Sequence, residues 1–97
     1  GAGAMLTTAG AVGVQAIRTA TPPGGLAIHE MGTARMGRDP KTSYLNGFNQ
    51  SHEVSNLFVT DGACMTSTAA QNPSLTYMAL TARAANHAVE RMKAGQL

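Results

Sequence analysis

The chain has 97 residues and a net charge of +2, and only 12% of its residues are charged. This length suits one small domain or part of a larger one. The seven basic residues are scattered instead of forming the stripe that nucleic-acid binding requires, so we expect no nucleic-acid partner. The single cysteine, Cys64, excludes an internal disulfide and a multi-thiolate metal site, and its small-residue surroundings favour a buried side chain.

The apolar residues can form only a modest core. Hydrophobic residues make up 43% of the chain, but aromatic residues make up only 4% and tryptophan is absent. We therefore expect that the segment does not fold stably alone. No apolar run approaches the ~20 residues that span a bilayer, and nothing at the amino terminus predicts a compartment, so bacterial cytoplasm and periplasm both stay open.

The first part of the chain alternates between short predicted elements and turns. Residues 2–9 predict a short helix that ends at Gly10. Residues 12–18 alternate apolar and polar side chains, which predicts a half-buried strand. Residues 20–25 contain two prolines and two glycines and predict a loop.

The middle of the chain predicts short strands that are separated by turns. Residues 26–29 predict a strand that leads into a segment bracketed by two glycines at positions 32 and 37. Residues 38–41 predict a turn, residues 43–45 an extended piece, and Asn46-Gly47 a chain reversal. Residues 56–60, Asn-Leu-Phe-Val-Thr, predict a short buried strand that Asp61-Gly62 ends.

A long helix is predicted at the end of the chain, between Pro73 and Gly95. Pro73 fits the first helical position, and Asn72 can cap the helix by accepting from a free backbone N–H. Gly95 is a typical end signal, and it follows two basic residues. One apolar stripe recurs at helical spacing and comprises Leu75, Met78, Ala79, Ala82, Ala85, Ala88, Val89 and Met92.

Three histidines are candidates for proton transfer. His29 stands between a predicted strand and the glycine-bracketed segment, so it is either a proton-transfer group or a hydrogen-bonded structural histidine. His52 lies in a predicted loop and His87 in the closing helix, and both are typical of surface or packing residues. Their spacing does not match that of a metal site.

Two further motifs each admit a structural and a functional interpretation. Asp61-Gly62 is either a plain turn or a place where a ribose, ribityl or phosphate group is held. Asn72-Pro73-Ser74 is either a helix cap or the rim of an open helix end. Such an end would present free N–H groups and a positive dipole to an anion.

These motifs, in this order, resemble the C-terminal region of the glucose–methanol–choline (GMC) flavoprotein oxidoreductases. The resemblance rests on residues 28–37 (IHEMGTARMG), 56–62 (NLFVTDG) and 72–76 (NPSLT), and it covers roughly residues 20–93. Within the family, the sequence is most similar to bacterial gluconate and sugar dehydrogenase flavoprotein subunits.

The resemblance implies FAD-dependent oxidation of a CH–OH group to a carbonyl, with hydride transfer to the flavin. It implies that His29 assists removal of the alcohol proton and that Asn72 hydrogen-bonds the substrate oxygen. It implies that Asp61 and Gly62 lie close to FAD. It also implies that Pro73, Ser74 and Leu75 face the flavin at the helix start.

The resemblance further implies an α/β fold, or α+β for the segment alone. Residues 1–55 would be part of the substrate-binding and catalytic region, and residues 56–97 would supply the closing strand and helix of the FAD-binding domain. The implied partners are an alcohol or sugar substrate, the rest of the flavoprotein chain, and a cytochrome or quinone as electron acceptor. The family's glycine fingerprint for FAD is absent from this chain, so we expect it to be a C-terminal part that is inactive alone.

Two other interpretations stay open. The chain could be a truncated remnant that keeps the motif residues without activity. It could also be a small structural or interaction module without FAD, in which case its own residues should cover the helix end at Asn72.

Overall fold

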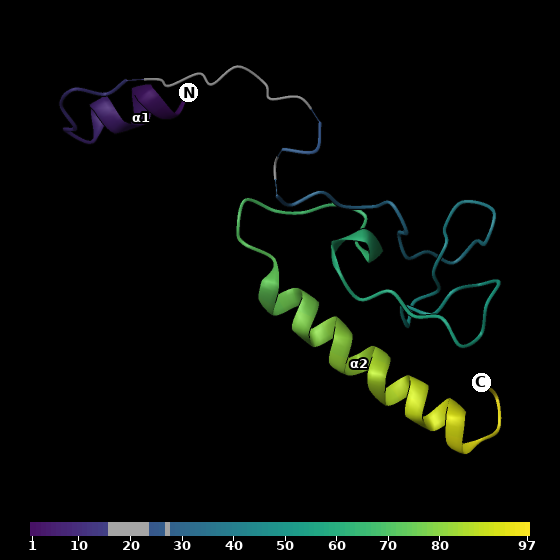
Figure 1. Cartoon of the computed structure of the whole chain (residues 1–97). Helices are drawn as coiled ribbons and strands as arrows, with labels where there is room; N and C mark the ends of the chain where they lie inside the picture. The colour runs from purple at the N-terminus through teal and green to yellow at the C-terminus, as the bar shows by residue number, and fades with distance from the viewer. Residues whose placement is uncertain (16–23, 27) are drawn as a thin grey trace.

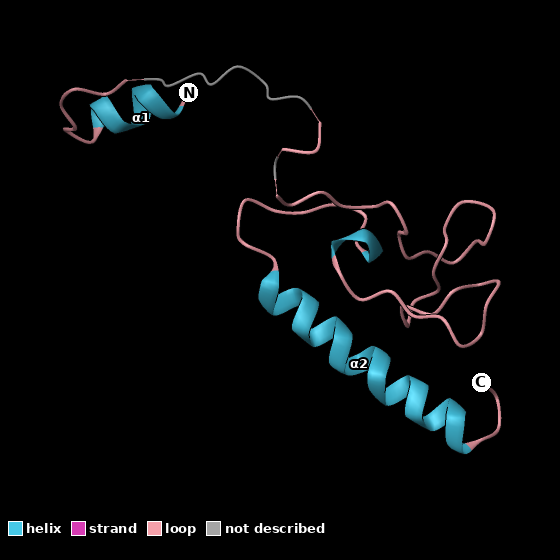
Figure 2. Cartoon of the chain, in the orientation of Figure 1, coloured by secondary structure: helices cyan, strands magenta, loops and turns pink. Residues whose placement is uncertain are grey.

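The computed structural model describes residues 1–15, 24–26 and 28–97, and helices are its only regular elements (Figures 1 and 2). They are the α-helix α1 (Ala2–Thr8), the 3-10 helix η1 (Gly62–Cys64) and the long α-helix α2 (Ser74–Lys93). The described residues form no β-strand, and their β-pairing is limited to isolated bridges. None of the described helices is long and apolar enough to cross a membrane.

Helix α1 confirms the predicted helix over residues 2–9 and its end before Gly10. The hydroxyls of Thr7 and Thr8 donate back to the carbonyls of Gly3 and Ala4, at 3.1 and 2.9 Å. None of its residues is buried, and Figure 1 shows it apart from α2. A helix of seven residues without tertiary contacts is marginal in water.

The predicted strands over residues 12–18, 26–29 and 56–60 are wrong for the described residues. Residues 12–15 form a bend and coil, and residues 16–18 lie outside the described part. Ile28 is 90% exposed and has φ +68°, which no strand residue adopts, while Ala27 lies outside the described part.

Residues 56–60 pair with their neighbours along one edge only. Phe58 bridges Gln50, Ser51 N–H donates to the Leu57 carbonyl at 2.8 Å, and Val59 N–H donates to the Asn49 carbonyl at 3.0 Å. A single bridge does not make a strand, because a ladder needs successive pairs.

Residues 34–59 fold as loops around the fully buried Leu45. Leu45 forms a parallel bridge with Met36 and an antiparallel bridge with Ser51, so its backbone joins two neighbouring segments. An extended piece was predicted over residues 43–45, and these bridges confirm it for its last residue, Leu45.

Both predicted turns in this region are confirmed, and each is held by a side chain. Asp39 Oδ1 accepts from Lys41 N–H at 2.9 Å, and the Asp39 carbonyl accepts from Ser43 N–H at 3.0 Å. At the reversal, Asn46 Oδ1 accepts from Phe48 N–H at 2.8 Å. Side-chain oxygens of Asp and Asn that satisfy the following backbone N–H groups are the reason these residues favour turns.

Helix α2 spans Ser74–Lys93, and its carboxyl end was predicted correctly. Gly95 has φ +67°, its N–H donates to the Met92 carbonyl, and Gln96 N–H donates to the Arg91 carbonyl. This pair of bonds is a Schellman motif, which requires a left-handed residue that glycine supplies without strain.

The amino end of α2 differs from the prediction. Pro73 stands at the cap position with φ −91° and ψ 2°, outside the helix, and no side chain caps it. The Pro73 carbonyl accepts the first helical bond from Tyr77 N–H at 3.0 Å. Asn72 is therefore one residue too early to act as the cap, and the prediction that it caps the helix is wrong.

The side of α2 that packs against the loops carries side chains that differ in size and polarity. Ala84 is 1% exposed, and the partly buried residues on the same side are Tyr77, Leu80, His87, Ala88 and Arg91. Figure 1 shows α2 lying along the loop region. His87 stacks on Phe48 with ring centroids 4.3 Å apart, which confirms its predicted packing role.

The hydrophobic core is small for the chain length. Only Leu45, Cys64, Pro73 and Ala84 are buried apolar residues among those described. The radius of gyration is 19.5 Å, whereas a compact domain of this length has about 12.5 Å. Both observations support the expectation that the segment does not fold stably alone.

Candidate functional site

The first two sequence motifs meet at Gly62, together with Tyr77, which directly follows the third motif. A Cβ atom built on Gly62 would lie 2.9 Å from the Glu30 carbonyl oxygen, 2.9 Å from Tyr77 Oη and 3.1 Å from Met31 Sδ. The Tyr77 hydroxyl also donates to Met31 Sδ at 3.4 Å. Residues from the His29 segment, the Asp-Gly turn and the first turn of α2 therefore share one tightly packed point, and only glycine fits there.

Backbone hydrogen bonds hold the His29 segment along η1. Ala34 N–H donates to the Ala63 carbonyl at 3.0 Å, and Met36 N–H donates to the Cys64 carbonyl at 2.8 Å. These bonds fix the segment after His29 against the turn that follows Asp61.

Asp61 has a structural role in this turn. Its Oδ1 accepts from Ala63 N–H at 2.9 Å and caps η1, while the side chain stays exposed. The structural interpretation of Asp61-Gly62 as a turn is therefore confirmed. The cofactor contact expected for these two residues stays a prediction.

His29 and Asn72 keep their side chains available. His29 is half-buried and Asn72 is exposed, and neither side chain forms a hydrogen bond with any described residue. The residues beside them are anchored, since Glu30 packs at Gly62 and Pro73 is buried. Within the described part, the interpretation of His29 as a hydrogen-bonded structural histidine therefore finds no support.

The amino end of α2 is open. The N–H groups of Ser74, Leu75 and Thr76 precede the first helical bond and have no side-chain cap. All three residues are exposed. Free N–H groups at the positive end of a 20-residue helix are a preorganised site for negative charge. This end fits the anionic edge of a flavin. It contradicts the interpretation of the chain as a module that covers this helix end with its own residues.

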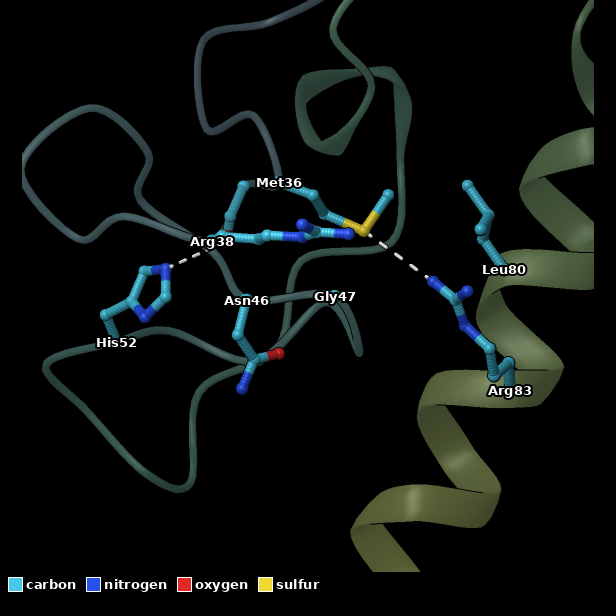
Figure 3. Close-up of a pocket in the computed structure, with 8 residues that line it drawn as sticks. Met36, Arg38, Asn46, Gly47, His52, Leu80 and Arg83 are labelled. Atoms are coloured by element: carbon cyan, nitrogen blue, oxygen red, sulfur yellow. Dashed lines mark hydrogen bonds between the residues drawn. The ribbon is translucent and has the colours of Figure 1, made fainter.

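A cleft of about 450 Å³ lies elsewhere, between α2 and the loops (Figure 3). Arg38 from the loop and Arg83 from α2 point toward one another across it, as Figure 3 shows. Arg83 Nη2 donates to Asn49 Oδ1 at 3.3 Å and lies near Met36 Sδ at 3.7 Å. None of the residues predicted for the site lines this cleft, which comprises Met36, Gly37, Arg38, Asn46, Gly47, His52, Leu80 and Arg83.

Sequence reasoning missed this cleft because its basic residues lie 45 positions apart and carry no motif. His52, which lines it, is half-buried, and its Nε2 lies 3.2 Å from Ser43 Oγ and 3.3 Å from the Gly37 carbonyl. These contacts confirm His52 as a packing residue.

Cys64 is fully buried, as predicted. Burial is the main cause that raises the pKa of its thiol, and the nearby Asp61 carboxylate adds to the rise. A thiol with a raised pKa is a poor nucleophile at neutral pH. Among the described residues, no group of three His, Cys, Asp or Glu side chains is arranged to hold a metal ion.

Comparison with known proteins identifies the family. The family model for the C-terminal region of GMC oxidoreductases matches residues 9–81. The chain is 44% identical over 70 residues to a 2-methyl-1,2-propanediol dehydrogenase of Mycolicibacterium austroafricanum, covering 72% of this chain and 12% of that protein. It is 36% identical over 81 residues to a paromamine 6'-oxidase of Streptomyces fradiae, covering 84% and 15%.

A third relative is a sugar dehydrogenase. The chain is 37% identical over 67 residues to the fructose dehydrogenase large subunit of Gluconobacter japonicus, covering 69% of this chain and 12% of that protein. No solved structure matches the chain significantly. The chain thus spans about an eighth to a seventh of the length of these relatives. The family match and these relatives lead to one conclusion: this chain belongs to the GMC oxidoreductases, as part of their C-terminal region.

Proposed function

We propose that the chain is the C-terminal catalytic segment of an FAD-dependent oxidoreductase that oxidises a CH–OH group to a carbonyl. One observation carries the proposal. The His29 segment, the Asp61-Gly62 turn and the first turn of α2 pack on one another at Gly62, beside a helix end whose N–H groups are open. A substrate class that includes alcohols and sugars is supported by relatives named as dehydrogenases of 2-methyl-1,2-propanediol and of fructose.

In this proposal, bound FAD supplies the hydride-accepting chemistry. The N–H groups of Ser74 and Leu75, with the backbone of Pro73, would hold the anionic edge of the flavin through the positive end of the α2 dipole. Asp61 and Gly62 would lie on the cofactor side, through the remaining carboxylate oxygen and the backbone. This assignment is consistent with the exposed side chain of Asp61.

His29 and Asn72 have complementary roles in this proposal. His29 would take the hydroxyl proton of the substrate, since histidine is the side chain that most often serves as a general base. Asn72 would hydrogen-bond the same oxygen and align it without a change in charge. Both roles require side chains that are not committed to the fold, which agrees with the absence of hydrogen bonds to them from described residues.

The remaining elements complete a larger protein. Residues 56–97 would add a closing strand and α2 to an α/β FAD-binding domain, and residues 1–55 would add to the substrate-binding region. The name "large subunit" of the fructose dehydrogenase relative indicates that it is one of several subunits. A further subunit, a cytochrome or a quinone could accept the electrons here as well.

The test replaces His29 by Ala in a full-length oxidoreductase that carries this segment. One such protein is a chimera in which this chain replaces the matching part of the Gluconobacter japonicus subunit. Flavin reduction by substrate, followed by stopped-flow absorbance, should slow by roughly 10²–10⁴-fold, because the base that takes the proton is lost. His52→Ala is the matched control and should leave the reduction rate unchanged.

A reduction rate within about threefold of the parent protein for His29→Ala would remove His29 from catalysis. A parent chimera that binds FAD but shows no reduction with any alcohol, sugar or sugar acid would favour the second interpretation, a remnant without activity.

A further inference from the structure

Two arginines face one another across the cleft between α2 and the loops (Figure 3). Arg38 comes from the loop region and Arg83 from the middle of α2, so both walls of the cleft belong to this chain. A guanidinium stays protonated throughout the physiological pH range. The lining of the cleft contains no Asp or Glu, so two positive charges share this space without a carboxylate in its walls.

The Arg83 side chain is held in place by the fold. Its Nη2 donates to Asn49 Oδ1 at 3.3 Å, and Asn49 is fully buried. Asn49 Nδ2 donates to the Val59 carbonyl at 3.0 Å, so the amide that orients Arg83 is itself fixed. The guanidinium carbon of Arg83 also lies 5.8 Å from the centroid of the Phe48 ring. An arginine that is oriented in this way loses little freedom when its remaining N–H groups bind a ligand.

Two backbone N–H groups add further donors. The N–H groups of Arg38 and Gly47 donate to no described residue, and both residues line the cleft. The backbone at Gly47 is open, since no heavy atom lies within 4 Å of a Cβ built there. The Asn46 side chain fixes this turn by accepting from Phe48 N–H at 2.8 Å. Guanidinium groups and free backbone N–H groups are the donors that proteins present to oxyanions.

We propose that the cleft binds the phosphate group of a small phosphorylated molecule between Arg38 and Arg83. A phosphate monoester carries about −1.5 to −2 charges at pH 7 and has three strong acceptor oxygens, which match two guanidinium groups on opposite walls. A carboxylate has one charge and two oxygens, so it would compensate only one arginine. The lining also includes the apolar Met36 and Leu80, and a volume of about 450 Å³ accommodates a small organic group beside the phosphate.

This phosphate site is separate from the proposed catalytic site. Neither His29 nor Asn72 lines the cleft. Arg83 stands nine residues after Ser74, the first residue of α2, which is about 14 Å along the helix axis. A phosphate at Arg83 is therefore too far from the open end of α2 to be held there as well. The inference does not depend on the proposed function.

The test titrates inorganic phosphate into the FAD-loaded chimera at constant ionic strength, with chloride as the balancing anion. We expect a saturable rise of the unfolding midpoint, because a ligand that binds only the folded state stabilises it. Arg38→Gln should raise the calorimetric dissociation constant for phosphate by at least about 10-fold, since charge-assisted contacts are lost. Lys41→Gln is the matched control. It removes the same charge from an exposed position outside the lining and should change the constant by less than about twofold.

Arg83→Gln provides a second variant with a distinct signature. It should weaken phosphate binding to a similar extent as Arg38→Gln. Without phosphate, it should also lower the unfolding midpoint, because its bond to Asn49 is lost. Arg38→Gln should leave that midpoint unchanged, since the Arg38 side chain forms no hydrogen bond with a described residue.

Four outcomes would overturn the proposal. Equal losses for Arg38→Gln and Lys41→Gln would show that net charge alone attracts phosphate. A dissociation constant for acetate within about threefold of that for phosphate would make the cleft a carboxylate site. Binding that is seen only after FAD is removed would assign the two arginines to the cofactor. No midpoint shift with phosphate would show that the rest of the chimera fills the cleft. Because none of these measurements involves substrate oxidation, each outcome leaves the proposed catalytic function untouched.

Discussion

At the scale of single residues, Gly62 decides how the motifs are arranged. Two segments that are distant from it in the sequence, at Glu30-Met31 and at Tyr77, approach its α-carbon closely enough to leave no room for a side chain. In the sequence, Gly62 is simply the second residue of an Asp-Gly turn. Its importance comes from the Glu30 carbonyl and the Tyr77 hydroxyl, which only folding brings to it.

Replacing Gly62 by Ala should therefore destabilise the chimera that carries this segment. The added methyl group would overlap the backbone of Glu30, which cannot swing away, so we expect a loss of about 1–3 kcal/mol in the free energy of unfolding. Urea titration followed by circular dichroism measures this loss. Gly47→Ala is the control, because no heavy atom lies within 4 Å of a Cβ built there. A Gly62→Ala variant as stable as the Gly47→Ala variant would show that this contact is absent in solution.

Cys64 should make the stability of the chain sensitive to alkaline pH. Burial raises the pKa of its thiol above the ordinary value of 9.0, so the folded state favours the protonated form. This contribution is complete below the ordinary pKa and is lost as the pH rises through the folded-state pKa.

Urea midpoints between pH 7 and pH 10.5 should therefore fall more steeply for the parent chimera than for its Cys64→Ala variant. The Ala variant should be less stable at neutral pH, because it leaves a small cavity. Parallel pH profiles for the two proteins would show that the Cys64 thiol has the same pKa in the folded and the unfolded state.

At the scale of elements, α2 is bounded by different means at its two ends. Its carboxyl end is closed by the Schellman bonds at Gly95, whereas its amino end lacks a side-chain cap. The N–H groups of an uncapped, exposed end can donate to water, to a ligand or to another segment. Asn72 therefore does not cap α2, and its side-chain amide is available for other contacts.

Asn72→Ala should therefore change the stability of the chimera by less than about 0.3 kcal/mol, since no cap bond is lost. Asp61→Ala is the matched comparison. It removes the bond from Ala63 N–H that caps η1, and it should cost about 1 kcal/mol.

In the chimera, Asn72→Ala should slow flavin reduction by substrate while the unfolding midpoint stays unchanged. A loss of stability without a change in reduction rate would restore Asn72 as a helix cap and remove it from the site.

At the scale of the whole molecule, the chain contains more apolar surface than its own contacts bury. Its radius of gyration exceeds that of a compact domain of this length, and only four apolar residues are buried among those described, namely Leu45, Cys64, Pro73 and Ala84. On α2, the large apolar side chains of Leu75, Met78 and Met92 stay mostly exposed. Such a chain is best understood as one part of a larger folded unit, which is why its function is tested in a chimera.

The sequence by itself determined the features that depend on neighbouring residues. Helix α1, the body and carboxyl end of α2, and the turns at Asp39 and Asn46 were predicted correctly. Each is stabilised by hydrogen bonds over a few positions and by residue-specific φ preferences, so local sequence is sufficient. The motifs also identified the family, because their order and spacing are properties of the sequence.

Only the tertiary structure decided which residues meet and which stay free. Phe58 was predicted in a strand but forms a single bridge, because strand formation requires a second segment that pairs over several residues. The packing at Gly62, the Arg38–Arg83 cleft and the exposure of the apolar stripe likewise depend on contacts between distant segments. Helical spacing revealed that α2 is apolar, but it could not tell which apolar residues this chain covers with its own loops.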